Sequence, residues 1–163
     1  MAARRRGHSP RTDDRWAELA DLVLVIAREI QFRGYQDERA VPLSQSEGMV
    51  MRYLNGNGEA SPSRIAAATG LQRTNLSTVL RGLEQKGLIV RQAHPVDGRG
   101  VTVVPTDRGR DNYRVVRREW AAQIFDAAGA DPTGLDTAVE LLRKIEVGLI
   151  TTRPGASGPR PDM

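Results

Sequence analysis

The sequence predicts a mainly α-helical fold that carries one small β-hairpin, and two kinds of pattern support this fold class. In long segments toward both ends of the chain, apolar residues recur at intervals of three and four, as they do on one face of an α-helix. In the middle, β-branched runs at 88–93 and 101–105 are bounded by glycine and proline, as the strands of a hairpin are. The chain has 163 residues, enough for a domain with its own hydrophobic core.

The composition excludes several classes of protein. Cysteine is absent, so the sequence supports neither a disulfide framework nor a thiolate metal site nor a thiol redox switch. No apolar run reaches the length of about 18 residues that a membrane span needs. The basic N-terminus is not followed by the apolar segment of a secretory signal. We therefore expect a cytoplasmic protein with no membrane partner.

The positive charge is concentrated in the middle of the chain. The net charge is +4, yet residues 62–118 hold 11 basic and 4 acidic side chains. The remainder of the chain is therefore slightly acidic. A basic middle between acidic ends indicates one region that faces a polyanion.

Long helices are predicted on either side of this middle region. Residues 1–13 and 153–163 lack apolar periodicity and are rich in Gly, Pro or Arg, so we expect disordered tails there. A helix is predicted over 14–36, and its apolar stripe consists of Trp16, Leu19, Val23, Ile26 and Ile30. A second such stripe falls within 107–151 and consists of Leu135, Ala138, Leu142, Ile145 and Leu149. These stripes must be buried somewhere, and we expect them to pack in a homodimer; the alternative is packing within a monomer.

Residues 43–106 are predicted to begin with two capped helices. Ser44 and Glu47 have the spacing of a capping box, and we expect the helix that they start to end at Asn55-Gly56. Ser61 then caps a short helix that Gly70 ends. The elements that follow are likewise bounded by capping and helix-breaking residues.

A longer helix over 73–86, the hairpin, and a helix capped by Thr106 complete the series. A short helix, a tight glycine-containing turn and a longer helix form a helix-turn-helix, in which the second helix enters the major groove of DNA. With the hairpin as its wing, the predicted architecture is a winged helix-turn-helix flanked by N-terminal and C-terminal dimerisation helices.

The helix over 73–86 has two chemically different faces. At about 100° per residue, one face collects Leu76, Val79, Leu80 and Leu83, which we expect to face the core. The opposite face has no carboxylate and consists of Thr74, Ser77, Thr78, Arg81 and Gln85. Arginine and glutamine match the base edges of guanine and adenine, whereas an ordinary solvated face usually mixes Glu with Lys. We therefore expect double-stranded DNA as partner, contacted by Arg73, Thr74, Asn75, Ser77, Thr78 and Arg81.

The hairpin tip, HPVDGRG at 94–100, carries one arginine more than an Asp-Gly turn requires. Such a tip can place a cation in the minor groove, where narrow A·T-rich DNA concentrates negative potential, and we assign this role to Arg99. Asp97 is expected to orient either Arg73 or Arg99; the alternative is that it only forms the turn and that Arg99 is solvated. Supporting roles at the DNA site are assigned to Asp97, Ser63, Arg91 and His94.

An ordered set of short motifs spans residues 65–106. It comprises an Ala-rich helix, Gly70-Leu71, Leu83-Glu84 followed by Gly87-Leu88, Arg91, Asp97-Gly98-Arg99 and Thr106. This set resembles the MarR family of transcriptional regulators, and the order of the flanking helices extends the resemblance over about 14–150. The resemblance implies a homodimer that binds a pseudo-palindromic operator and is often released by a small-molecule effector. Pro105 departs from the family's pattern, in which an apolar residue precedes the threonine.

Other functions fit the sequence less well. The two histidines, His8 and His94, fall in a tail and in the wing, and the acidic residues form no metal-binding or paired-carboxylate pattern. We therefore expect no catalytic residues, no metal and no cofactor. A repressor is the expected role. The alternatives are an activator or antirepressor that acts without an effector, and a protein-interaction module whose binding would show no salt-sensitive attraction to DNA.

Overall fold

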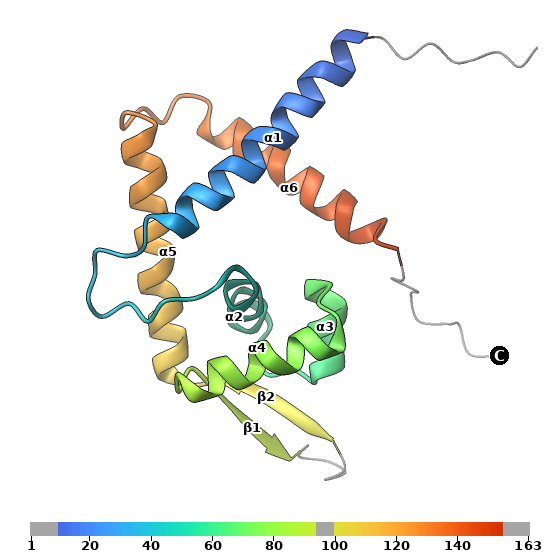
Figure 1. Cartoon of the computed structure of the whole chain (residues 1–163), viewed down its shortest axis with the longest axis vertical. Helices are drawn as coiled ribbons and strands as arrows, with labels where there is room; N and C mark the ends of the chain where they lie inside the picture. Colours follow the sequence, from blue (N-terminus) through green and yellow to red (C-terminus); the bar gives the residue numbers. More distant parts are fainter. Residues whose placement is uncertain (1–9, 94–99, 155–163) are drawn as a thin grey trace, which may run out of the picture. The chain divides into compact units, whose positions relative to one another are not determined.

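The computed structural model describes residues 10–93 and 100–154, which fall into two units that are considered separately (Figure 1). The first unit, residues 1–34, contains α1 (Pro10–Phe32). The second unit, residues 35–163, contains α2 (Gln45–Asn57), α3 (Pro62–Thr69), α4 (Arg73–Gln85), β1 (Ile89–Ala93), β2 (Val101–Pro105), α5 (Asp107–Ala127) and α6 (Leu135–Thr151). The predicted fold class, mainly α-helical with one hairpin, is confirmed.

Side-chain caps begin the helices of the second unit. Ser44 accepts a hydrogen bond from the backbone N–H of Glu47 at 3.2 Å, and the Glu47 carboxylate accepts one from the Ser44 N–H at 2.8 Å. This reciprocal pair is the predicted capping box. The Ser61 side chain caps α3 by accepting from the Arg64 N–H, and the Thr106 side chain caps α5 by accepting from the Gly109 N–H, as the sequence also predicted. In the first unit, α1 begins at Pro10, four residues before the predicted start at residue 14.

One predicted helix end was wrong by a short distance. We expected Asn55-Gly56 to end α2, but the helix continues to Asn57. Gly58 ends it instead, because Gly58 adopts φ +75°, a conformation that other residues rarely take, and donates its N–H to the Leu54 carbonyl at 2.8 Å. The sequence predicted that α2 ends at Gly56, the first glycine of the NGNG stretch, whereas the helix ends at the second, Gly58.

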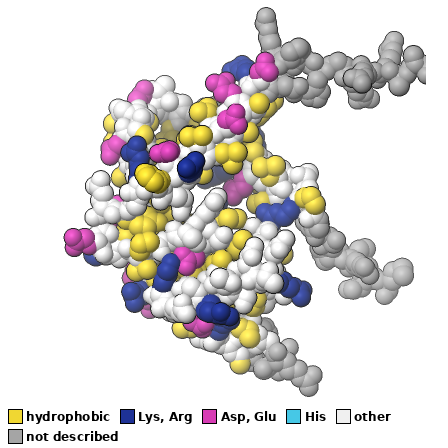
Figure 2. All heavy atoms as spheres, viewed as in Figure 1, with side chains coloured by type: hydrophobic (Ala, Val, Ile, Leu, Met, Phe, Trp, Pro, Cys, Tyr) yellow, Lys and Arg dark blue, Asp and Glu magenta, His cyan; other side chains and the backbone are white. Residues whose placement is uncertain are grey.

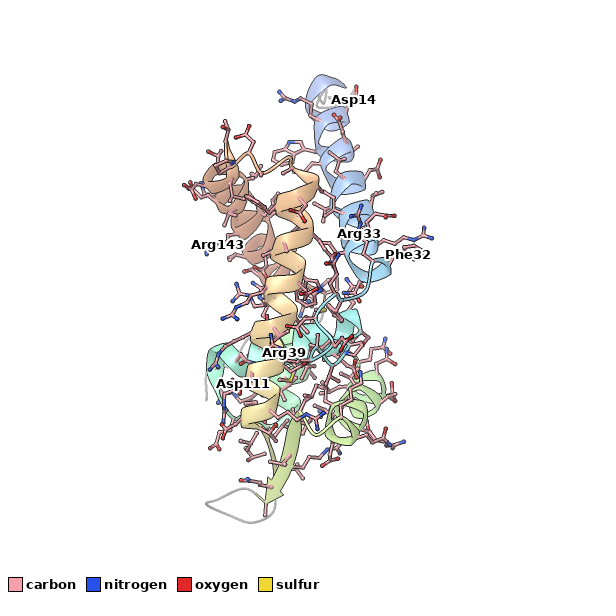
Figure 3. All side chains as sticks on the ribbon, turned by 90° about the vertical axis from the view of Figure 1, so that its left-hand side faces the viewer. Asp14, Phe32, Arg33, Arg39, Asp111 and Arg143 are labelled. Atoms are coloured by element: carbon pink, nitrogen blue, oxygen red, sulfur yellow. The ribbon has the colours of Figure 1, made fainter. Side chains whose placement is uncertain are left out.

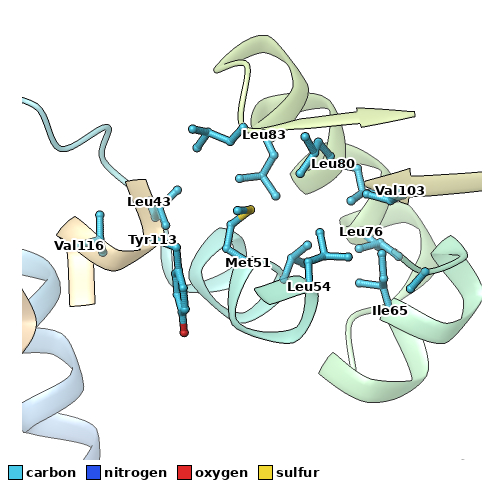
Figure 4. Packing of buried hydrophobic residues seen from close by; sticks show 14 residues of the cluster. Leu43, Met51, Leu54, Ile65, Leu76, Leu80, Leu83, Val103, Tyr113 and Val116 are labelled. Carbon is cyan, nitrogen blue, oxygen red and sulfur yellow. The ribbon is translucent and has the colours of Figure 1, made fainter. Parts of the chain in front are cut away.

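A single hydrophobic cluster joins the helices to the hairpin in the second unit. Figure 4 shows Met51 of α2 near its centre, with leucines of α4 and the aromatic ring of Tyr113 around it. Buried residues come from α2, α3, α4, α5 and both strands, and they include Leu54, Ile65, Leu76, Leu80, Leu83, Val103 and Val116. The core therefore lies directly behind α3, α4 and the wing and fixes their relative positions.

The hairpin pairs antiparallel from Ile89 opposite Pro105 to Ala93 opposite Val101. Pro105, the departure noted in the sequence, occupies the last position of β2, where a residue without an N–H is tolerated. Its side chain is fully buried, and the next residue, Thr106, donates its backbone N–H to the Leu88 carbonyl at 3.0 Å. Proline thus fills the apolar place at this position and leaves the hairpin's exit intact.

The terminal helices leave apolar side chains exposed within one chain. In α6 no residue is buried, and Leu149 is 67% exposed. In α1 the exposed apolar residues include Trp16 and Phe32, the latter at the end of the helix near Arg33 (Figure 3). Most residues of the two predicted stripes are exposed in the single chain, whereas Leu19, Ile30 and Ile145 are partly buried.

Candidate nucleic-acid interface

The turn between α3 and α4 sets the geometry of the candidate site. Pro62 occupies the first turn of α3, and Gly70 ends that helix with φ +73°, donating its N–H to the Ala66 carbonyl at 2.8 Å. Only residues 70–72 separate α3 from α4. At the start of α4, the side chain of the N-cap residue Gln72 accepts no hydrogen bond from the first backbone N–H groups of the helix. A helix start of this kind, with Arg73 beside it, suits a phosphate group.

The helix α4 divides into a buried face and an exposed face. Leu76 and Leu80 are each 2% exposed and Leu83 is fully buried, whereas Val79 is only partly buried at the edge of the core. The residues expected to contact DNA on this helix are all exposed: Arg73, Thr74, Asn75, Ser77, Thr78 and Arg81. Among them, Thr78 is the residue whose hydroxyl contacts the helix itself, 3.4 Å from the Thr74 carbonyl. The remaining side chains are available to a partner.

The cations around α4 differ in whether they already have a partner. Within the described part of the chain, Arg64, Arg73 and Arg81 form no ion pair. Arg91 of β1, by contrast, lies 3.4 Å from Glu84 of α4. In Figure 2, dark-blue Lys and Arg side chains lie over the region where Figure 1 places α3, α4 and the hairpin. Three unpaired guanidinium groups therefore give this region a positive surface.

A pocket of about 270 Å³ opens beside α4. It is lined by Pro62, Ser63, Arg73, Leu76, Ser77, Leu80 and Arg91. The structure thus brings together four of the residues that the sequence assigned to the DNA site, from α3, α4 and β1. Leucines form the apolar part of its lining, while two serines and two arginines supply hydrogen-bond donors that suit an anionic oxygen.

The wing is attached firmly at its base. The Thr106 hydroxyl donates to the Gly87 carbonyl at 2.8 Å and accepts from the Gly109 N–H at 2.9 Å. A methyl group at Gly109 would overlap the Leu88 carbonyl oxygen, so α5 and the start of the hairpin approach each other more closely than any side chain would allow. The predicted tip residues His94, Asp97 and Arg99 lie outside the described residues.

Two positioning contacts were missed in the sequence. Lys86, at the end of α4, donates to the buried carboxylate of Glu47 at 2.8 and 2.7 Å. The sequence identified Glu47 only as half of a capping box, since nothing local reveals a partner 39 residues away. Arg153 was assigned to a C-terminal tail, but its guanidinium donates to the Ala67 carbonyl of α3 at 3.1 Å.

Two further properties concern the described residues alone. Their His, Asp and Glu side chains form no group of three or more that could hold a metal ion. None of their helices combines the length and the apolar character required to cross a membrane.

Comparisons with known proteins agree with this geometry. The model of the MarR family matches residues 42–100, a segment that begins three residues before α2 and ends at the residue before β2. An uncharacterized HTH-type transcriptional regulator of Mycobacterium leprae (strain TN) is 28% identical over 118 residues, which make up 71% of this chain and 80% of that protein.

Two solved structures show the same fold. Sco3205, a MarR family transcriptional regulator from Streptomyces coelicolor in complex with DNA, is 18% identical with a TM-score of 0.68, covering 94% of this chain and 95% of that one. BpsR of Bordetella bronchiseptica, whose DNA binding is regulated by 6-hydroxynicotinic acid, is 22% identical with a TM-score of 0.57, covering 79% and 98%. Residues 42–100 thus match the model of the MarR family, and the chain has the winged helix-turn-helix fold of these solved structures.

Proposed function

We propose that the protein is a homodimeric repressor that binds a pseudo-palindromic operator in double-stranded DNA. The exposed face of α4 enters the major groove in each half-site, and Arg99 of the wing enters the adjacent minor groove. The observation that carries this proposal is the state of α4: its leucine face is buried, while Arg73 and Arg81 project from the other face without an ion pair among the described residues. Such a face offers hydrogen-bond donors to phosphates and bases without a competing carboxylate between them.

The contacts divide by function. Arg81 is the candidate for bidentate recognition of a guanine, because it lies in the second half of the exposed face, beyond the first turn. Arg73 and the serines Ser63 and Ser77 surround the pocket beside α4, and we assign them to a DNA phosphate. Arg91 is held by Glu84 and supports the edge of the same pocket.

The proposed dimer is supported by the apolar surfaces of the terminal helices. A single chain leaves α6 without any buried residue, and its exposed side chains include Leu135, Val139, Leu142, Val147 and Leu149. A soluble protein rarely leaves so many apolar side chains of one helix in water, so a second copy is the proposed partner. Dimerisation also gives two recognition helices, as a two-fold operator requires.

A small-molecule effector is the proposed signal for release from DNA. Support comes from BpsR, which has the same fold and whose DNA binding is regulated by 6-hydroxynicotinic acid. Release requires only that the ligand favour a dimer in which the two α4 helices no longer match the half-site spacing. Aromatic carboxylic acids are therefore the first compounds to screen.

The experiment is selection of bound fragments from a random DNA pool with the full chain, followed by titration of the selected duplex at several salt concentrations. We expect an inverted repeat, and an affinity that falls steeply as salt rises because phosphate contacts release counterions. Repetition with candidate acids identifies compounds that displace the protein. Enrichment of no sequence, or binding that does not respond to salt, would contradict the proposal.

A further inference from the structure

Two arginines join α6 and the segment that follows it to α2 and α3. Arg52 of α2 forms a bidentate ion pair with Glu146 of α6, with N–O distances of 2.7 and 3.0 Å. Arg153, two residues beyond the end of α6, reaches the carboxyl end of α3, where it lies 3.1 Å from the Ala67 carbonyl and 3.5 Å from the Ala68 carbonyl. Because α6 itself has no buried residue, these polar contacts are important for holding it against α2 and α3.

The contact of Arg153 has a clear physical basis. The last carbonyls of a helix have no N–H partner within the helix, and they carry the negative end of its dipole. Gly70 satisfies only the Ala66 carbonyl, which leaves those of Ala67 and Ala68 for the guanidinium. Gly70 also makes room: a methyl group there would overlap the guanidinium of Arg153.

We propose that Arg153 is a positioning residue for DNA recognition, which couples the placement of α6 to that of α3 and thereby to α4. The coupling is short, since residues 70–72 alone separate α3 from α4 and the two helices share the core through Ile65 and Leu76. This inference rests on the proposed function, in which α6 contributes to the dimer. A dimer interface at α6 then sets the distance between the two α4 helices through Arg153.

The role of Arg153 differs from ordinary stabilisation in what it controls. A merely structural contact would change the fraction of folded protein and so lower the affinity for every DNA duplex alike. A positioning contact would change which separation of the half-sites is preferred, while the folded dimer remains. The preference among operators of different spacing is therefore the decisive readout.

The test compares three full-length variants: Arg153→Gln, Arg153→Lys and, as matched control, Arg143→Gln. Arg143 projects from α6 (Figure 3) and has no partner among the described residues, so its replacement makes the same change of charge without breaking a contact. Light scattering and thermal unfolding first establish that each variant is as dimeric and as stable as the wild type. Lysine retains a cation that can donate to the same carbonyls.

The first measurement is hydrogen–deuterium exchange without DNA. Arg153→Gln should accelerate exchange in peptides that cover the end of α3 by about three- to tenfold, whereas Arg143→Gln should not. Unchanged exchange in Arg153→Gln would overturn the coupling. Because this measurement uses no DNA, it tests whether Arg153 restrains the end of α3 independently of DNA binding. A wild-type protein that bound no DNA would refute the proposed function instead.

The second measurement is fluorescence anisotropy with the selected operator and with duplexes whose half-sites are moved apart or together by one base pair. We expect Arg153→Gln to bind the preferred spacing on the order of tenfold more weakly and to discriminate less among spacings. Arg153→Lys should restore most of the discrimination. A wild-type spacing profile in Arg153→Gln, or an equal loss at every spacing, would overturn the proposal.

Discussion

Lys86, the residue that follows α4, donates hydrogen bonds to both carboxylate oxygens of Glu47 in α2 at 2.8 and 2.7 Å. It also donates to the Pro42 carbonyl at 2.8 Å. Glu47 is 6% exposed and simultaneously completes the capping box with Ser44. The end of α4 is thus fixed to the start of α2 by a charge-assisted contact that shields a buried carboxylate.

Replacement of Lys86 by methionine should therefore destabilise the fold. The variant leaves the Glu47 carboxylate buried without its cation, and the expected loss is about 1.5–3 kcal/mol in the free energy of unfolding, measured in urea. Lys144→Met is the control, because Lys144 forms an exposed ion pair with Glu140 one turn away and should change stability by less than about 0.5 kcal/mol. Equal losses in the free energy of unfolding for the two substitutions would show that the buried pair stabilises the fold no more than the exposed pair does.

The close approach of α5 to the hairpin predicts a strong effect at Gly109. In Gly109→Ala, the added methyl group must displace the Leu88 backbone, which also accepts the Thr106 N–H, so we expect a loss of about 1–3 kcal/mol in urea unfolding. Gly56→Ala provides the contrast: this glycine is helical and faces open space, so alanine should stabilise by up to about 1 kcal/mol. An unchanged or increased stability of Gly109→Ala would contradict the packing described at the base of the wing.

Removal of the Arg81 side chain should alter recognition without altering the fold. Arg81 is exposed and unpaired among the described residues, so Arg81→Ala should unfold like the wild type. Its affinity for the selected operator should fall by about 1–3 kcal/mol, and selection with the variant should return a relaxed preference at one position in each half-site. Arg143→Ala, on α6, should keep both the affinity and the preference. The assignment of Arg81 to a base is wrong if its variant selects the wild-type sequence.

Arg99 is predicted to act through the shape of the flanking DNA. Arg99→Ala should weaken binding most at operators whose flanks are A·T-rich, because a narrow minor groove attracts a cation more strongly than a wide one. The measurement is a comparison of wild-type and variant affinities for the same operator with A·T-rich and G·C-rich flanks. A loss that is the same for both flanks would assign Arg99 to a phosphate instead.

The local elements of the fold were predictable because their signals are local. The capping box at Ser44 and Glu47, the cap at Thr106 and the leucine face of α4 are each defined by residues within a few positions of one another. The exposed face of α4 followed from the same periodicity. The bounds of two helices were exceptions. The first helix, α1, begins at Pro10, before its predicted start, and in α2 the NGNG stretch offers two glycines, of which only Gly58 adopts a positive φ.

The contacts that hold these elements together were not predictable from one sequence. Asn112 of α5 is buried and bonds both backbone groups of Val41, 71 residues away. Arg153 and Ala67 are 86 residues apart. No local pattern links residues at such separations, and each of these polar side chains would be unremarkable on a solvated surface. Helical periodicity therefore predicted which face of α4 is exposed, but not what fixes α4 in place.

In the proposed function, two copies of the chain read one operator with two α4 helices. The most direct measurement is the mass of the complex between the full-length protein and the selected duplex, by light scattering, for the intact operator and for one with a scrambled half-site. We expect two chains per intact duplex and a large loss of affinity when one half-site is scrambled. A complex with one chain per duplex, or an affinity that ignores the second half-site, would contradict the account.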